Sequence, residues 1–344
     1  MSACQAISII NDAYRCDPFS PVLEGGLKAA KYEGRVMVGY GGGEEGDGRQ
    51  LTASDYSQAG LISGIATRCI IQPLDVLKIR FQLQEEPLHG LHKGKYSGIV
   101  QALFLIRKEE GMTAFWKGHV PAQGLSAIYG LVQFTSFEML TSKAVDIPLA
   151  LAYRGVTDFV CGAVAGCCAM TTAMPLDVIR TRLVAQGEPK VYRGTLHAAF
   201  CIWRFEGLRG YFRGLSPSLA QIAPYTGIQF ALYNWFNDIW RRFICKYETT
   251  GALICGALAG TASKTVLYPL DMIRHRLQMR GFKRRGFGKT TQCRTMIGTF
   301  VHVTQHESAL GLFKGLWPSM LKAAANSGFA FLFYELALDL IRAL

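Results

Sequence analysis

The sequence predicts an all-α membrane protein, with six transmembrane helices in a threefold pseudosymmetric bundle of three repeats of about 100 residues. Two observations predict this fold class. Half of the 344 residues are hydrophobic, only 18 % are charged and 37 are glycine, a composition that favours a membrane protein. In addition, one string returns three times, as PLDVLKIR, PLDVIRTR and PLDMIRHR, starting at Pro73, Pro175 and Pro269.

Two further markers follow each copy of this string, always in the same order. A Glu-Gly element ends at Gly118, Gly214 and Gly315, although Ser308 replaces its first glycine in the third copy. A second proline stands three residues later, at Pro121, Pro217 and Pro318. Chance similarity does not explain three markers in one order. We therefore expect a flexible N-terminal tail over 1–50 and three repeats over 51–150, 151–247 and 248–344.

Each repeat consists of a long apolar helix, a polar connector, a short amphipathic helix and a second long apolar helix. In the first repeat the pattern predicts helices at about 56–84, 97–109 and 118–143. A spanning helix needs about 20 mainly apolar residues, and no segment is an uninterrupted run of that length. Helices that line a polar cavity show this weakness because one face is wet. A soluble helical solenoid is the alternative, but its repeats are typically about 20–50 residues long.

The first 50 residues differ from the rest and end in the polar, glycine-rich run GYGGGEEGDGRQ. They lack the apolar core of a secretory signal, and they contain acidic residues, in which transit peptides are depleted. Met37 could serve as an alternative start. We assign this tail no function.

The formal net charge of +12 is spread along the chain, with one dense cluster at 283–285. A nucleic-acid binder usually concentrates such charge in stripes, so we expect no nucleic-acid partner. The ten cysteines form no C-x-x-C pair. Those in Gly/Ala-rich runs are expected to be buried thiols without a metal: Cys161, Cys167, Cys168 and Cys255. Without a phosphate loop or nucleophile elbow we expect no enzyme, no catalytic residue and no cofactor.

The charges of the triple string are placed for ion pairs between repeats. Positions i and i+3 share a helix face, so the acidic and basic residue of each copy point the same way. One isolated charge at mid-membrane would cost about 2.5–3.5 kcal/mol. If the three acids and three bases alternate around a threefold axis, they can neutralise one another and close one end of a cavity reversibly. The alternative is a set of fixed ion pairs that never open. The ring comprises Asp75, Lys78, Asp177, Arg180, Asp271 and Arg274.

Three copies of P-x-D-x-x-[KR]-x-[KR], each followed by a Glu-Gly and aromatic-[KR]-Gly element, resemble the mitochondrial carrier family over residues 51 to 344. The resemblance implies a six-helix bundle in the inner mitochondrial membrane, with short matrix helices and alternating access between two gates. The ring would be the matrix gate. Gln82 and Gln278 occupy the family's glutamine-brace position, while Val184 departs from it.

The opposite gate of the family has the pattern [FY]-[DE]-x-x-[KR] on even-numbered helices. Here the strings are FEMLT, YNWFN and YELAL, so Glu138 and Glu335 remain while Asn234 replaces an acid. None of the basic partners is present. We therefore expect a weak cytosolic gate and less strict coupling of exchange.

Symmetry also indicates which residues face the substrate. Five residues before the motif prolines stand Arg68, Met170 and Lys264. On the even-numbered helices, residues four, eight and twelve after the second proline form one stripe. Its polar members are Gln221, Lys322, Tyr129, Tyr225, Asn326, Gln133 and Gln229.

Arg68, Lys264 and Lys322 have no obvious acidic partner in their own helices, and a cation in that position indicates a ligand site. Neither pairing nor packing explains Lys322 in particular. Tyr129 and Tyr225 offer ring faces to a heterocycle or an organic cation. The alternative is that the tyrosines pack between helices and the lysines snorkel to an interface.

The expected ligand is anionic at one end and flat at the other, which fits both nucleotides and thiamine diphosphate. The strings FWKGHVPAQ, AQGEPKVY and SKTVLYPLD resemble the branch of the family that carries thiamine diphosphate. That resemblance implies import into the matrix in exchange for nucleotides or thiamine monophosphate. The alternatives are a nucleotide or coenzyme A carrier, or a membrane scaffold or proton leak. We expect a monomer whose further partner is the lipid bilayer, including cardiolipin, with both termini toward the intermembrane space.

Overall fold

The computed structural model describes residues 53–86, 94–144, 154–243, 248–282, 293 and 295–343. The tail over 1–50 with Met37, and the basic cluster at 283–285, lie outside these residues. In the described ranges the regular secondary structure is helical, and no strand occurs.

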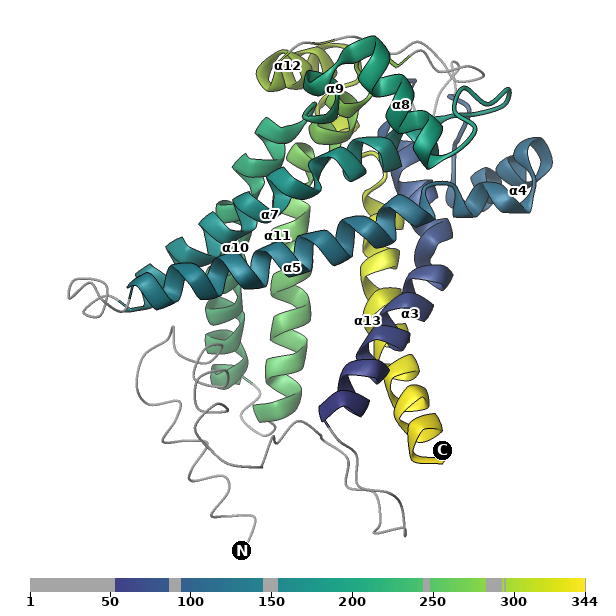
Figure 1. The fold of residues 1–344 in the computed structure, drawn as a ribbon. Helices are drawn as coiled ribbons and strands as arrows, with labels where there is room; N and C mark the ends of the chain where they lie inside the picture. Colours follow the sequence, from purple (N-terminus) through teal and green to yellow (C-terminus); the bar gives the residue numbers. More distant parts are fainter. Residues whose placement is uncertain are drawn as a thin grey trace, which may run out of the picture. The chain divides into compact units, whose positions relative to one another are not determined.

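Six long helices account for most of the described chain, two in each repeat (Figure 1). At about 1.5 Å of rise per residue, even a 26-residue helix exceeds the hydrocarbon thickness of about 30 Å. The expected helices of the first repeat agree with the observed ones to within three residues. The six helices are α3 (Ala53–Gln82), α5 (His119–Ala144), α7 (Arg154–Ala185), α10 (Leu215–Phe243), α11 (Glu248–Gln278) and α13 (Leu316–Ala343).

The motif prolines lie inside α3, α7 and α11 rather than at their ends. A proline leaves the carbonyl four residues earlier without its helical donor. Cys69 stands four residues before Pro73, and its carbonyl accepts a hydrogen bond from the indole Nε1 of Trp116 at 3.0 Å. A neighbouring element of the same repeat therefore satisfies the carbonyl, as expected for a proline in a membrane helix.

A short helix and a tight turn connect the two long helices of each repeat. The short helices are amphipathic, with Ala102 and Ile106 of the first one buried and Phe104 exposed. Each turn ends at a glycine with positive φ, and Gly118, Gly214 and Gly315 are equivalent in this respect. The connecting elements are α4 (Ile99–Glu110) and a 3₁₀ turn (Met112–Trp116), α8 (Thr195–Glu206) and α9 (Leu208–Tyr211), and α12 (Met296–His306) and a 3₁₀ turn (Ala309–Phe313).

The contacts divide the chain into two compact units. The larger one holds residues 50–132 and 167–344, and the smaller one contains 133–166. Within the smaller unit, Phe137 of α5 faces Gly162 of α7, where an added Cβ would lie 3.9 Å from the ring.

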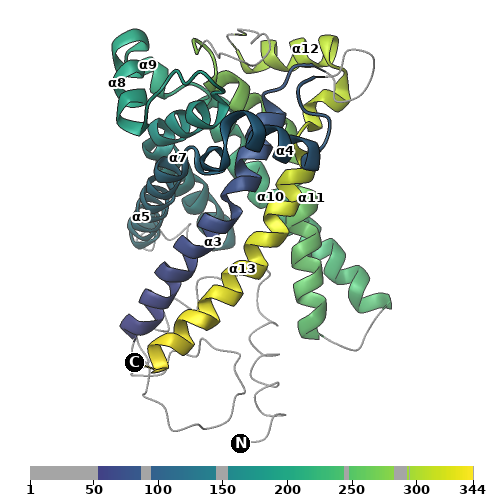
Figure 2. The ribbon, with the colours of Figure 1, turned by 90° about the vertical axis from the view of Figure 1, so that its right-hand side faces the viewer.

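In the larger unit, α13 lies along α3 (Figures 1 and 2). Ala59 of α3 packs against Ala337, Leu338 and Ile341 of α13, and the Ser63 hydroxyl donates to the Ala330 carbonyl at 2.7 Å. The last and first repeats are thus joined by small and aliphatic residues. Helix α10 packs along α11.

Three described helical stretches are long and apolar enough to cross a membrane: Gln58–Gln82, Gly155–Ala185 and Ala309–Arg342. Large apolar side chains on the long helices point outward, such as Leu61, Leu131 and Trp317. Exposed apolar surface of this extent indicates contact with lipid rather than with water.

Candidate substrate cavity and gate

The three acidic and three basic residues of the repeated string meet in one place. The structure pairs Asp75 with Arg180, Asp177 with Arg274, and Asp271 with Lys78, each across two repeats at 2.6 Å. The six side chains are largely buried, with exposed fractions of 4–17 %. Buried charges are tolerated when they are paired and hydrogen-bonded, as these six side chains are. The ring is closed at all three positions.

The two glutamines bind the carboxylates of this ring. The Gln82 amide donates to Asp271 Oδ2 at 3.2 Å and to the hydroxyl of Tyr268 at 2.9 Å. The Gln278 amide donates to Asp177 Oδ2, and its oxygen accepts a bond from the Thr181 hydroxyl at 2.7 Å. Val184, at the third equivalent position, has no polar side-chain atom, so the pair of Asp75 and Arg180 lacks such a donor.

A second layer of ion pairs, which the sequence reasoning missed, lies at the C-terminal ends of α3, α7 and α11. The last arginine of each string forms an ion pair with the acid of the Glu-Gly element. The cation of the aromatic-[KR]-Gly element binds the same carboxylate. The groups are Arg80, Glu110 and Lys117; Arg182, Glu206 and Arg213; and Arg276, Glu307 and Lys314. The repeat of these residues at fixed spacing was the available signal.

Each arginine of this layer also holds the next repeat. Arg80 Nε donates to the Val184 carbonyl at 3.1 Å, and Arg182 Nε donates to the Gln278 carbonyl at the same distance. Arg276 Nε donates to the Gln82 carbonyl at 3.2 Å. Carbonyls at a helix C-terminus lack helical donors, so each arginine caps the first long helix of the neighbouring repeat, which is α7, α11 or α3.

Glu110, outside the spanning segments, illustrates the electrostatics of this layer. Burial alone would raise the pKa of the Glu110 carboxyl, but hydrogen bonds from Arg80 and Lys117 outweigh it and hold that pKa below its ordinary value. The carboxylate and the guanidinium are each only 1 % exposed, so removing either would leave a buried charge.

The glycine after each aromatic-[KR] pair lies against the backbone of the ring residues. At Gly214, with φ of 83°, an added Cβ would come within 2.9 Å of the Arg274 carbonyl oxygen. At Gly315, with φ of 85°, it would come within 3.0 Å of the Lys78 carbonyl oxygen. Only glycine permits this backbone conformation and this approach, so the turns are held close to the ring.

Lys322 is not without a partner, and the sequence interpretation was wrong on this point. Its Nζ lies 2.5 Å from Asp75 Oδ1, so α13 of the third repeat contacts the ring directly. The expectation failed because an acidic partner was sought within the same helix. The lysine keeps an exposed fraction of 29 %, against 9 % for the aspartate. Lys322 can therefore be reached from outside the ring while it is paired.

Arg68 and Lys264 occupy equivalent positions and make equivalent contacts. Arg68 Nη1 donates to the Ala122 carbonyl at 3.0 Å, and Lys264 Nζ donates to the Ser319 carbonyl at 3.2 Å. Within the described part of the chain neither cation forms an ion pair. Lys264 interacts electrostatically with Lys322, so positive charge gathers beside the ring.

A cavity of about 750 Å³ brings together two of the predicted substrate residues, Tyr225 of α10 and Lys264 of α11. Small residues such as Gly256 and Gly260 leave room along one wall, and Trp317 contributes an aromatic ring. This volume lies within the range of small-molecule sites, which are mostly apolar with few polar groups.

The remaining predicted substrate residues are only partly placed. Tyr129 is half-buried on α5 and interacts electrostatically with Arg274 of the ring. Gln221 and Gln229 are half-buried on α10, and Asn326 is exposed on α13. Gln133 belongs to the smaller unit.

The two remaining acids of the opposite gate, Glu138 on α5 and Glu335 on α13, are both exposed. No ion pair of either is present among the described residues. Asn234 is also exposed and has no charge to offer. This leaves the expectation of a weak cytosolic gate as it stood.

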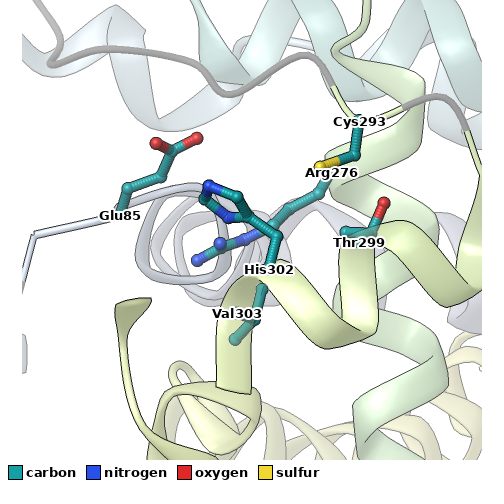
Figure 3. A pocket seen from close by; sticks show the side chains of 6 residues that line it. All are labelled: Glu85, Arg276, Cys293, Thr299, His302 and Val303. Carbon is teal, nitrogen blue, oxygen red and sulfur yellow. The ribbon is translucent and has the colours of Figure 1, made fainter. Parts of the chain in front are cut away.

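A separate small pocket lies beside α12, and Arg276 of the second ion-pair layer is one of the residues that line it (Figure 3). Figure 3 shows Glu85, Arg276, Cys293, Thr299, His302 and Val303 around it. Within the ranges that the structure describes, no group of three metal-ligating side chains occurs. Of the four cysteines expected to be buried, Cys161 and Cys255 are buried, Cys167 is half-buried and Cys168 is exposed, which corrects the last of these expectations.

Comparison with known proteins agrees with this geometry. The family described as mitochondrial carrier protein matches residues 49–146, 153–243 and 246–343. The chain belongs to the mitochondrial carrier family. The three matches confirm the three-repeat, six-helix membrane fold that the sequence predicted.

The relatives within the mitochondrial carrier family share most of their length with this chain. A mitochondrial thiamine pyrophosphate carrier of Pongo abelii is 47 % identical over 306 residues, covering 87 % of this chain and 95 % of the relative. The protein of the same name from Homo sapiens has the same identity and coverage. Mitochondrial thiamine diphosphate carrier 1 of Zea mays is 36 % identical over 335 residues, covering 88 % of this chain and 98 % of the relative. As a carrier of this family, the protein is a mitochondrial membrane transporter.

Proposed function

We propose that this protein imports thiamine diphosphate across the inner mitochondrial membrane. The observation that carries the proposal is the excess of positive charge beside the closed ring. The three acids and three bases of the ring neutralise one another, while Arg68, Lys264 and Lys322 supply three further cations. The names of the relatives support the choice of substrate.

The diphosphate group is the part of the substrate that these cations suit. Lysines bind phosphate as point charges, whereas an arginine can bind two phosphate oxygens at once. Lys264 and Arg68 are each bonded only to backbone carbonyls in the described structure, and an anion would be a stronger acceptor.

The aromatic part of the substrate suits the tyrosines. Thiamine carries a positively charged thiazolium ring, and such a ring is attracted to an aromatic face. Tyr225 lines the same cavity as Lys264, so one ligand can contact both. Tyr129, Gln221, Gln229 and Asn326 are the further residues that we assign to this site. Gln133 remains a prediction from the sequence pattern.

The ring of ion pairs is the matrix gate in this proposal, and Gln82 and Gln278 brace it. It is closed in the described structure, so the cavity is in its cytosol-facing state. Glu138 and Glu335 remain the residues that we assign, from the sequence pattern, to the opposite gate. Alternating access then requires the ring to open once the substrate is bound.

Exchange is the mode of transport that we propose, with nucleotides or thiamine monophosphate leaving the matrix. The membrane potential opposes inward movement of an anion by about 2.3 kcal/mol per charge and 100 mV. Outward movement of another anion offsets that cost. Both termini would face the intermembrane space, and the monomer would contact the bilayer and cardiolipin.

Exchange can be measured with purified protein in liposomes that contain one candidate counter-substrate at a time. Labelled thiamine diphosphate outside should enter fastest when the liposomes contain thiamine diphosphate, thiamine monophosphate or a nucleotide. External nucleotides and coenzyme A then serve as competitors. Faster uptake of coenzyme A or a nucleotide, with no uptake of thiamine diphosphate, would assign the protein to another substrate.

A further inference from the structure

One ion pair of the ring differs from the other two. In two of the three pairs a glutamine amide donates to the aspartate, from Gln82 to Asp271 and from Gln278 to Asp177. Val184 stands where the third glutamine would be and is fully buried. The pair of Asp75 and Arg180 therefore lacks the amide that the other pairs have.

Lys322 contacts this same pair. Arg180 Nη2 binds Oδ2 of Asp75 at 2.6 Å, and Lys322 Nζ binds Oδ1 at 2.5 Å. The carboxylate of Asp75 thus holds two cations, one on each oxygen. The positions equivalent to Lys322 in the other repeats are Leu125 and Gln221, which carry no charge.

We propose that Lys322 takes the place of the missing third brace, and that the substrate's diphosphate opens the gate at this pair by drawing Lys322 away from Asp75. The inference rests on the proposed function. A phosphate oxygen and the Asp75 carboxylate compete for the same ammonium group. Once the lysine has moved, only Arg180 holds Asp75, while the other two pairs keep their glutamines.

The geometry suits such an exchange of partners. Lys322 is 29 % exposed and can therefore be approached by a ligand, whereas Asp75 is 9 % exposed behind it. Arg68 interacts electrostatically with both Asp75 and Arg180, so a second cation for the anion lies nearby. A charge-assisted hydrogen bond changes an equilibrium by roughly ten- to a hundredfold, and the open state would gain about that factor. A ligand can shift a gate only through such a difference in affinity between the two states.

The chain offers a direct way to restore the missing brace. Gln82 and Gln278 pack against Gly315 and Gly214, and Val184 packs against the equivalent Gly118. A glutamine should therefore fit in place of Val184. In Val184→Gln, loss of Lys322 to the substrate would no longer leave the pair unbraced, so the maximal uptake rate should fall with little change in half-saturation.

The decisive experiment measures the melting temperature of the detergent-purified protein without substrate, so it does not depend on what is carried. Lys322→Gln should lower the melting temperature, and adding Val184→Gln should restore it. In a second measurement, with thiamine diphosphate added, the double variant should not regain the stabilisation that the substrate gives the wild type. Lys264→Gln is the matched control, because Lys264 binds a carbonyl rather than the ring and should gain nothing from the added glutamine.

A double-mutant cycle covers the case in which Val184→Gln does not fold. Asp75→Asn and Lys322→Gln should show less than additive losses of melting temperature, because they remove the same interaction. Additive losses, or equal rescue of Lys264→Gln by the added glutamine, would overturn the proposal. If wild-type protein carried no thiamine diphosphate while rescue was still specific to Lys322, the brace would stand and only the substrate assignment would fail.

Discussion

Asp75 differs from the other two carboxylates of the ring because each of its oxygens holds a separate cation. The triple string predicted the acids and bases of the ring, since symmetry fixes which positions are equivalent. It did not predict that Lys322 reaches Asp75, because a lysine side chain is long and flexible and its partner lies in another repeat. Sequence reasoning is weakest where one repeat departs from the other two, as Val184 and Lys322 do.

Lys322 is also the residue whose replacement should affect substrate most. Lys322→Gln should weaken binding of thiamine diphosphate by roughly ten- to a hundredfold, the value of one charge-assisted hydrogen bond. Lys322→Arg keeps the charge and should retain part of the uptake. Half-saturation and maximal rate in liposomes distinguish these cases, and unchanged values in Lys322→Gln would remove the lysine from the site.

The pair of Asp177 and Arg274 allows a test of the ring that leaves Lys322 untouched. Asp177→Arg alone and Arg274→Asp alone should each stop most of the uptake, because each puts two like charges side by side. The double variant restores opposite charges and should recover part of the activity. If the double variant is folded and as inactive as the single ones, ion pairing at this position is not required.

At the scale of elements, the spacing and the hydrophobic pattern of the sequence predicted the helices of each repeat. They did not predict which side chains cap the helix ends. Arg80, Arg182 and Arg276 were missed because the carbonyls that they cap belong to the next repeat. Ser308 is another local departure with a structural cost. It has φ of 72° and ψ of 165°, the conformation that Gly111 and Gly207 adopt in the other repeats.

Ser308→Gly should therefore stabilise the protein. A non-glycine residue in this region costs about 1–3 kcal/mol, and the substitution gives up one bond from the Leu310 N–H to the serine hydroxyl, about 1 kcal/mol. The melting temperature should rise. Gly111→Ser is the matched control in the first repeat and should lower it, since an added Cβ there meets no atom and only the backbone is strained. A lower melting temperature of Ser308→Gly would contradict this account of the turn.

Glu110 makes the second layer sensitive to acid. Because the folded protein holds the pKa of this carboxyl below its ordinary value of about 4.3, its stabilisation is complete above that value and is lost as the pH falls through the lowered pKa. Glu110→Gln should cost about 3–5 kcal/mol at neutral pH, because it removes the carboxylate that neutralises the buried Arg80 guanidinium. The melting temperature of the variant should also decrease less than that of the wild type between about pH 5 and 3. Equal pH dependence in both proteins would show that Glu110 does not carry this charge.

At the scale of the whole molecule, three copies of one unit provide a ring that can close without leaving an unpaired charge. In our proposal the departures from symmetry provide the binding site. Arg68, Lys264 and Lys322 do not recur at the equivalent positions of all three repeats, so a ligand would contact different side chains on each repeat. Composition and repeats could predict the bundle. They could not choose the substrate, because phosphorylated heterocycles share the same charge and shape.

The central claim is that the excess positive charge beside the gate selects the diphosphate form of thiamine. Uptake of labelled thiamine, thiamine monophosphate and thiamine diphosphate by liposomes with the purified wild-type protein, each measured against internal thiamine diphosphate, tests it most directly. We expect saturable uptake that is highest for the diphosphate, lower for the monophosphate and at the level of protein-free liposomes for thiamine. Equal uptake of all three, or none of the diphosphate, would contradict the account.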